Sequence, residues 1–345
     1  MSQRILFATN RVLNGMTGGL PNLGDVPIAP GAAFSCALAT VDDTDSTDQD
    51  SGSVTAVTPL VPGAFAPADL QALLDSKNDV LVLIHGAGND FHASLTRASY
   101  NQKWLSQIAV GGVARTYDVI AFSWPARNYV LQGLSALADG IDDYTHDRDS
   151  AAGSASHIAQ FFKLLYALRA QIGARRMHLL AHSMGVYALG GAVEQWFGDT
   201  TVPAQPLFDE IILAAGDEVS STFTAEKGGR LSNLYRLGRE ITVYFNGNDI
   251  LMHLSRVVNQ LFHLGYHGPP GMASLKTYPA KIYDFVNCLR LKYLSDEVDH
   301  THQYYRETIA IRTDIATNLA GLVPQRPFYF KDENFYAFAK VDTSS

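Results

Sequence analysis

Residues 176–192 read RMHLLAHSMGVYALGGA and predict the fold of the chain. The first part is an apolar run typical of a strand buried on both faces of a parallel sheet, and the residues after Ser183 have helical spacing. Ala181 lies two residues before the serine and Gly185 two residues after it, in the pattern small-x-Ser-x-Gly. This pattern indicates a nucleophile elbow, a sharp strand-to-helix turn that exposes one serine hydroxyl. Glycine is commoner than alanine at the position of Ala181 in this pattern, and alanine differs from it by only one methyl group.

Further apolar runs alternate with helical segments and extend this unit into a larger sheet. Helical spacing follows His92, Ala155 and Val186. Because the later strand runs lack strict alternation of polar and apolar residues, we expect an α/β fold with a mostly parallel central sheet flanked by helices. The predicted strands begin at Arg4, Phe34, Asp79, Tyr117, Arg176, Glu210 and Glu240.

The composition is that of a globular protein. The 345 residues are 47% hydrophobic and 17% charged, and no linker rich in Pro, Gly or Ser divides them, so we expect one domain over residues 1–345.

The segment 126–150 follows a strand and precedes a helix, so we expect a small cap insertion over the carboxyl edge of the sheet, although its aromatic residues could equally cover core. The acidic stretch 41–53 lacks the closing glutamate of a calcium loop and predicts a solvated turn.

Charge and motifs exclude several classes of partner. The formal charge is −8 and the 26 basic residues are scattered, which argues against nucleic acid. No run has the length of an integral membrane segment and no secretory signal is recognisable, so we expect a cytoplasmic protein. The two cysteines, Cys36 and Cys288, predict neither a disulfide framework nor a metal site. Without a zinc or phosphate-binding motif we expect no cofactor. The sequence does not predict the oligomeric state.

A serine nucleophile requires an imidazole base and a carboxylate that orients it, in the chain order Ser, acid, His for this elbow. Asp249 ends the strand run that starts at Glu240, so its carboxylate should emerge at the same sheet edge as Ser183. Asp217, one strand earlier, is the alternative. We favour Asp249 because the later strand lies nearer to a histidine arriving from the C-terminal segment. Either aspartate could instead only cap the following helix.

Five histidines follow Asp249, and His302 is the preferred base. It directly precedes a predicted helix, where a loop can bring the imidazole over the sheet edge. His300, two residues earlier, is the alternative. His182 is adjacent to the serine and cannot fold back onto it.

The oxyanion of the tetrahedral intermediate requires two backbone N–H donors. Met184, directly after the nucleophile, is one candidate. The other is Ala87 in the loop HGAGND after the predicted strand from Asp79, where Gly86 allows a close turn. We expect His85 to be a structural residue of that turn.

The chain resembles the α/β-hydrolase superfamily, and within it a bacterial group of domain-of-unknown-function hydrolases. The resemblance rests on the ordered blocks FATNR, IHGAGNDF, AFSWPAR, YTHDRDSA, LLAHSMG, IILAAGDE, VYFNGND and HQYYRE, which cover most of residues 4–322. It implies Ser183, Asp249 and His302 as a catalytic triad, with Ala87 and Met184 as the oxyanion hole. We therefore expect hydrolysis of a small-molecule carboxylic ester or thioester through an acyl-serine. An amidase or lactonase with the same triad, or a binding protein that has lost catalysis, are the alternatives.

Overall fold

The structure is a computed structural model that describes most of the chain. The described residues are 2–42, 52–129, 137–199, 201–272, 277–278, 282–289, 301–326, 328–329 and 335–337. The predicted acidic turn therefore lies largely outside the described residues, as do residues 130–136 of the predicted insertion and His300.

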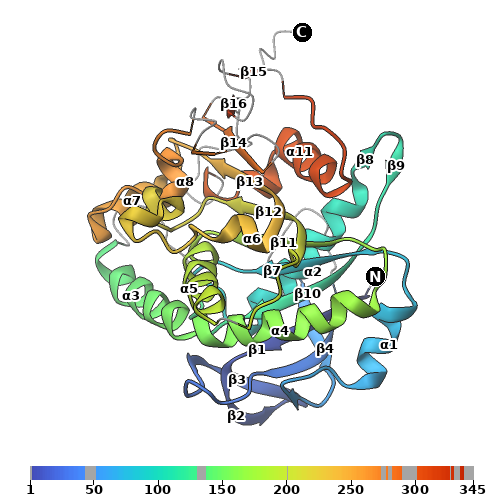
Figure 1. The fold of residues 1–345 in the computed structure, drawn as a ribbon. Helices are drawn as coiled ribbons and strands as arrows, with labels where there is room; N and C mark the ends of the chain where they lie inside the picture. The colour runs from blue at the N-terminus through green and yellow to red at the C-terminus, as the bar shows by residue number, and fades with distance from the viewer. Residues whose placement is uncertain are drawn as a thin grey trace.

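A twelve-stranded mixed sheet forms the centre of the described part of the chain (Figure 1). Every strand pair between β16 and β1 is parallel, and the pairs at the two ends of the sheet are antiparallel. The predicted fold class is thereby confirmed. In spatial order the strands are β15 (Phe328–Tyr329), β16 (Phe335–Ala337), β14 (Tyr283–Asn287), β13 (Gly238–Phe245), β12 (Phe208–Ala214), β11 (Met177–His182), β7 (Asp79–Ile84), β10 (Tyr117–Ser123), β1 (Ser2–Thr9), β4 (Ser35–Asp42) and β5 (Ser53–Val57), with β6 (Val61–Pro62) paired to β4.

Each of the seven strand runs predicted from the sequence forms a strand of this sheet. The structure adds β5, β6, β14, β15 and β16 to the sheet, and it adds two hairpins outside the sheet that the apolar pattern does not predict. These hairpins are β2 (Arg11–Thr17) with β3 (Leu20–Pro27), and β8 (Ala109–Val110) with β9 (Val113–Ala114).

Helices cover both faces of the sheet (Figure 1). Their bounds are α1 (Pro67–Asp75), α2 (Phe91–Gln107), α3 (Leu137–Gly153), α4 (Ala155–Gln171), α5 (Met184–Gly198), α6 (Leu234–Leu237), α7 (Ile250–Asn259), α8 (Leu264–His267), α10 (Tyr304–Glu307) and α11 (Ile309–Leu319), with short 3₁₀ turns at Ser220–Phe223 and Ala225–Lys227. None of the helices in the described ranges is long and apolar enough to cross a membrane.

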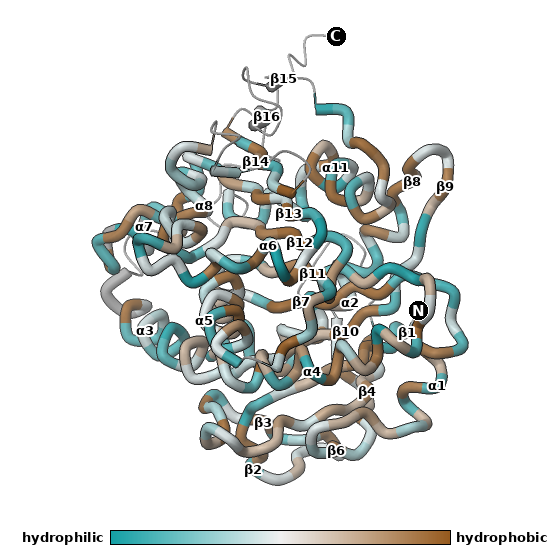
Figure 2. The backbone as a smooth tube through the Cα atoms, in the orientation of Figure 1, coloured by the Kyte–Doolittle hydropathy of each residue, from teal (hydrophilic) through white to brown (hydrophobic). Residues whose placement is uncertain are grey.

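Two hydrophobic cores lie on opposite faces of the sheet because successive strand residues point to opposite sides. Val82 of β7 belongs to the core that includes Phe161 of α4. Its neighbour Leu83 belongs to the core that includes Leu95 of α2 and Ile315 of α11. Figure 2 shows the hydrophobic residues gathered along the inner strands and α5, whereas α3 carries long hydrophilic stretches. The carboxyl ends of the parallel strands are therefore fixed by packing from both sides.

Candidate active site

Ser183 lies on the turn between β11 and α5. Its backbone angles, φ 54° and ψ −126°, belong to a region that non-glycine residues rarely occupy. The Ser183 amide donates to the Ala214 carbonyl at 3.0 Å, and its own carbonyl accepts from the Asp217 amide at 3.0 Å. Hydrogen bonds to the neighbouring strand thus hold the turn in the strained conformation typical of a nucleophile elbow.

Two glycines allow the elbow to contact the end of β7. A Cβ atom on Gly185 would lie 2.5 Å from the carbonyl oxygens of both Ile84 and His85. A Cβ atom on Gly86 would lie 2.8 Å from the Ser183 Cβ. Side chains at these positions would force the segments apart, so the glycines bring the 85–89 loop directly against the serine.

Asp249 and His302 form a buried pair. The Asp249 carboxylate is fully buried and its Oδ2 atom accepts from His302 Nδ1 at 2.8 Å. Its Oδ1 atom accepts from the Met252 amide at 3.0 Å and caps α7. Asp249 therefore contacts the candidate base and also caps α7. Because Nδ1 of His302 donates its hydrogen to the carboxylate, the nitrogen that is free to accept a proton is Nε2.

The segment that carries His302 lies beside the elbow. The ring centroids of His302 and His182 are 4.7 Å apart, and His182 Nε2 lies 3.4 Å from the His302 carbonyl oxygen. Since His182 directly precedes Ser183, this contact brings the base candidate next to the nucleophile candidate. Burial, followed by the charges of His302 and Arg306, holds the pKa of His182 well below its usual value, so this imidazole is neutral.

Asp217, the alternative acid, belongs to a different buried cluster. Its Oδ1 atom accepts from Ser255 Oγ at 2.6 Å and its Oδ2 atom accepts from the Tyr144 hydroxyl at 2.6 Å. His263 Nδ1 lies 2.9 Å from Asp217, and His263 Nε2 lies 3.4 Å from Ser255 Oγ. Both ring nitrogens of His263 therefore face Asp217 and Ser255 rather than Ser183. This cluster joins α3 and α7 to the loop after β12.

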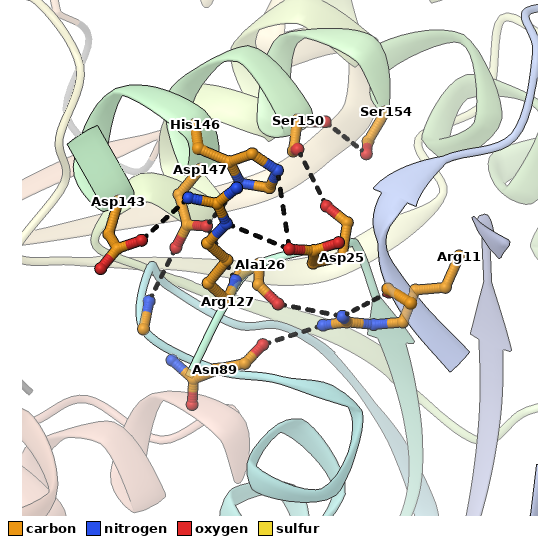
Figure 3. A network of polar contacts seen from close by, with 12 residues as sticks. Arg11, Asp25, Asn89, Ala126, Arg127, Asp143, His146, Asp147, Ser150 and Ser154 are labelled. Carbon is orange, nitrogen blue, oxygen red and sulfur yellow. Dashed lines mark hydrogen bonds and ion pairs between the residues drawn. The ribbon is translucent and has the colours of Figure 1, made fainter. Parts of the chain in front are cut away.

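The loop with the predicted oxyanion donor Ala87 is held by several hydrogen bonds (Figure 3). Asn89 Nδ2 donates to the carbonyls of Gly86 at 3.0 Å and Ala87 at 2.7 Å. The Gly88 amide, at a glycine with φ 70°, donates to Asp147 Oδ2 at 2.9 Å. Arg11 Nη2 donates to the Asn89 carbonyl at 2.8 Å. The 85–89 loop is thus anchored to α3 and to the start of β2.

Sequence reasoning gave no role to Asp147 or Arg11, although both lie in the blocks that carry the family resemblance. Asp147 is fully buried on α3 and also accepts from the Arg127 amide at 2.8 Å. Burial raises the pKa of Asp147 and lowers the pKa of Arg11 to about 9. Arg11 also donates to the Ala126 carbonyl at 3.0 Å, so one guanidinium joins the loops that follow β7 and β10.

The remaining predicted residues lie around this loop. His85 stacks on Trp124 with ring centroids 4.8 Å apart, and burial lowers its pKa to about 3, so it is a neutral residue of the turn. Ala87 is partly buried against the core, and Met184 is fully buried at the start of α5. Within the described ranges, no group of three or more His, Cys, Asp or Glu side chains is arranged to hold a metal ion.

Several solved structures and one family model are similar to this chain. Among solved structures, the chain is similar to a product of gene lin2722 from Listeria innocua, with 14% identity, 76% of this chain and 100% of that chain covered, and a TM-score of 0.35. It is also similar to an inhibited esterase B from Lactobacillus rhamnosis, with 14% identity, 72% of this chain and 78% of that chain covered, and a TM-score of 0.38. Likeness at this level supports no conclusion about chemistry. A search of curated proteins found no match.

A family model gives a firmer result. It is described as an alpha/beta hydrolase of unknown function (DUF900) and matches residues 66–317, which include the elbow, the 85–89 loop and the Asp249–His302 pair. The chain has the mostly parallel sheet expected of that family. The protein therefore belongs to this family of α/β hydrolases.

Proposed function

We propose that the protein is a serine hydrolase that cleaves a carboxylic ester or thioester through an acyl-serine intermediate. The observation that carries this proposal is the strained Ser183 turn beside the buried Asp249–His302 pair. A serine hydroxyl is a weak nucleophile at neutral pH, and this arrangement supplies the base and the carboxylate that activate it.

The reaction proceeds in two halves. Ser183 Oγ attacks the substrate carbonyl carbon while His302 Nε2 takes the hydroxyl proton, and that proton passes to the departing alcohol or thiol as its bond to the acyl carbon breaks. Water then attacks the acyl-serine by the same route and releases the acid and the free serine. Asp249 keeps the imidazole in the required tautomer and stabilises its charged form. The amides of Ala87 and Met184 bind the oxyanion in both halves.

The insertion at 126–150 acts as a cap within a single domain spanning residues 1–345. Its described helix α3 packs against α5 and supplies Asp147 to the 85–89 loop and Tyr144 to the Asp217 cluster. These contacts support a cap over the carboxyl edge of the sheet, where ligands bind in open α/β folds.

Labelling with a fluorophosphonate tests the nucleophile. We expect one adduct, which peptide mass mapping places on Ser183, and no labelling of Ser183→Ala. Ser255→Ala is the matched control because Ser255 also lies beside a histidine and an aspartate. This control should label like the unmodified protein. An adduct on Ser255, or none on protein shown to be folded, would refute the assignment.

A further inference from the structure

Tyr304 lies two residues after His302, at the start of the short helix α10. Its side chain is fully buried. The hydroxyl donates to the Tyr244 carbonyl at 2.9 Å and accepts from the Ala215 amide at 3.1 Å. One phenol therefore joins the segment that carries the candidate base to the carboxyl ends of two neighbouring strands, β12 and β13.

The Ala215 amide lies where the β12–β13 ladder ends. Ala214 and Tyr244 are the last paired residues of these two strands. The Ala215 amide is shared between the Tyr244 carbonyl at 3.2 Å and the Tyr304 hydroxyl at 3.1 Å. Ala215 has φ 49°, in the left-handed region that is unfavourable for a residue with a Cβ atom. The Tyr304 hydroxyl thus binds the backbone at a strained turn.

Residues on either side of Ala215 also hold the nucleophile candidate. The Ala214 carbonyl accepts from the Ser183 amide at 3.0 Å, and the Asp217 amide donates to the Ser183 carbonyl at 3.0 Å. The turn to which Tyr304 is bonded therefore holds both backbone polar groups of Ser183.

The Tyr244 carbonyl, the other partner of Tyr304, lies near the end of β13, which leads to the acid candidate. Asp249 follows Tyr244 by five residues, and its amide donates to the Asn246 carbonyl at 3.1 Å. This turn keeps Asp249 close to the end of the strand. The Tyr304 hydroxyl is therefore bonded at the point where the segments of all three triad candidates meet.

We propose that Tyr304 is a positioning residue that fixes the His302 imidazole relative to the Ser183 hydroxyl. This inference rests on the proposed function, in which the base takes the serine proton. Because Tyr304 is fully buried, it acts through His302 rather than on the substrate. Without the hydroxyl, the base segment loses its attachment to Tyr244 and Ala215. A displacement of a catalytic group by about 1 Å can reduce the rate about 10²-fold.

Tyr304→Phe removes the hydroxyl and keeps the buried ring. We expect kcat for a nitrophenyl ester to fall about 10 to 100-fold with KM within about twofold, because the base is displaced and the substrate contacts are not. Tyr278→Phe is the matched control, since Tyr278 is 2% exposed and its hydroxyl donates to the Pro270 carbonyl at 3.2 Å. Both variants should lose some thermal stability, but only Tyr304→Phe should lose kcat. Equal kcat in the two folded variants would overturn the proposal.

Proton magnetic resonance of the same proteins gives a readout that does not depend on catalysis. The Nδ1 proton that His302 donates to Asp249 should give a low-field signal, assigned by its loss in His302→Ala. We expect this signal to shift or broaden in Tyr304→Phe and to stay unchanged in Tyr278→Phe. An unchanged signal in folded Tyr304→Phe would also overturn the proposal. If the unmodified protein hydrolyses no ester, the proposed function fails, and the spectrum still decides whether Tyr304 positions His302.

Incorporation of 4-aminophenylalanine at position 304 provides a conservative variant. Its amino group keeps a donor for the Tyr244 carbonyl but is a poorer acceptor for the Ala215 amide. We expect a kcat between those of the unmodified protein and Tyr304→Phe, with KM unchanged. This variant decides the question if Tyr304→Phe does not fold, because an unchanged kcat would then contradict the positioning role.

Discussion

Asp249 uses its two carboxylate oxygens for different partners, His302 and the amide that begins α7. In Asp249→Asn the amide oxygen can still cap the helix, but the amide nitrogen then faces His302 and favours the wrong tautomer. We expect kcat for a nitrophenyl ester to fall about 10⁴-fold while the protein stays folded.

Asp217→Asn is the matched control for this residue. The Asp217 carboxylate contacts Tyr144, Ser255 and His263, so the main effect of this variant should be on the free energy of unfolding rather than on kcat. A folded Asp217→Asn protein with the larger loss of kcat would transfer the role of acid to Asp217.

The two buried histidines that contact an aspartate permit a parallel comparison. His302→Ala removes the proposed base, and we expect kcat to fall by at least about 10⁴-fold. His263→Ala should keep kcat within about tenfold in folded protein, because both nitrogens of His263 face the Asp217 cluster. Steady-state kinetics with folding checked by circular dichroism measures both. Equal losses in the two variants would argue against the assignment of His302.

At the level of elements, helix α3 positions the 85–89 loop through one carboxylate. Asp147 accepts from two backbone amides, whereas an asparagine offers only one oxygen, so Asp147→Asn leaves one amide facing an N–H₂ group. We expect kcat to fall about 10 to 100-fold with little change in KM, since a displaced donor weakens transition-state binding.

Asp143→Asn, on the same helix, is the control. Asp143 binds the Arg127 side chain at the surface and does not contact the loop. This variant should keep the kcat of the unmodified protein. A rise in KM with unchanged kcat in Asp147→Asn would mean that the carboxylate supports substrate binding instead.

The apolar pattern could predict the inner strands but not the edges of the fold. Strands such as β11 are buried along their whole length, so they consist of continuous hydrophobic residues that can be recognised in the sequence. Strand β2 is mostly exposed and pairs with β3 through irregular register, so its sequence has no comparable signal. Strand β14 contains Asp284, whose charge is matched by Arg326, 42 residues away.

The candidate site also contains residues that a sequence pattern can predict and residues that it cannot. Ser183, Asp249 and His302 could be predicted because the elbow motif and the chain order constrain them. Asp147 stands in a charged run that looks solvated. Its partners are backbone amides 59 and 20 residues away, and no local pattern encodes such contacts.

For the whole molecule, the Asp217 cluster should control stability in acid. Burial alone would raise the pKa of Asp217, but the contacts with His263, Arg148 and Ser255 outweigh it and hold the pKa well below the usual value. A carboxylate with a lowered pKa stabilises the fold fully above its unfolded pKa of about 3.9, and this contribution is lost as the pH falls further.

We therefore expect the free energy of unfolding to decline more steeply below about pH 4 in the unmodified protein than in Asp217→Asn. Urea titrations at several pH values measure this slope. Asp75→Asn, at an exposed position, should decline like the unmodified protein. Parallel pH profiles of the unmodified protein and Asp217→Asn would exclude this role.

The position of β1 inside the sheet has a consequence for synthesis on the ribosome. Its antiparallel partner β4 ends at Asp42, but its parallel partner β10 is much later in the chain, and the Thr9 hydroxyl donates to the Ser123 carbonyl across 114 residues. At 5–20 residues per second, the strand waits roughly 6 to 23 s for that partner. During this interval one long edge of β1 is open to other nascent chains, so chaperone demand should concentrate between the synthesis of β1 and the synthesis of β10.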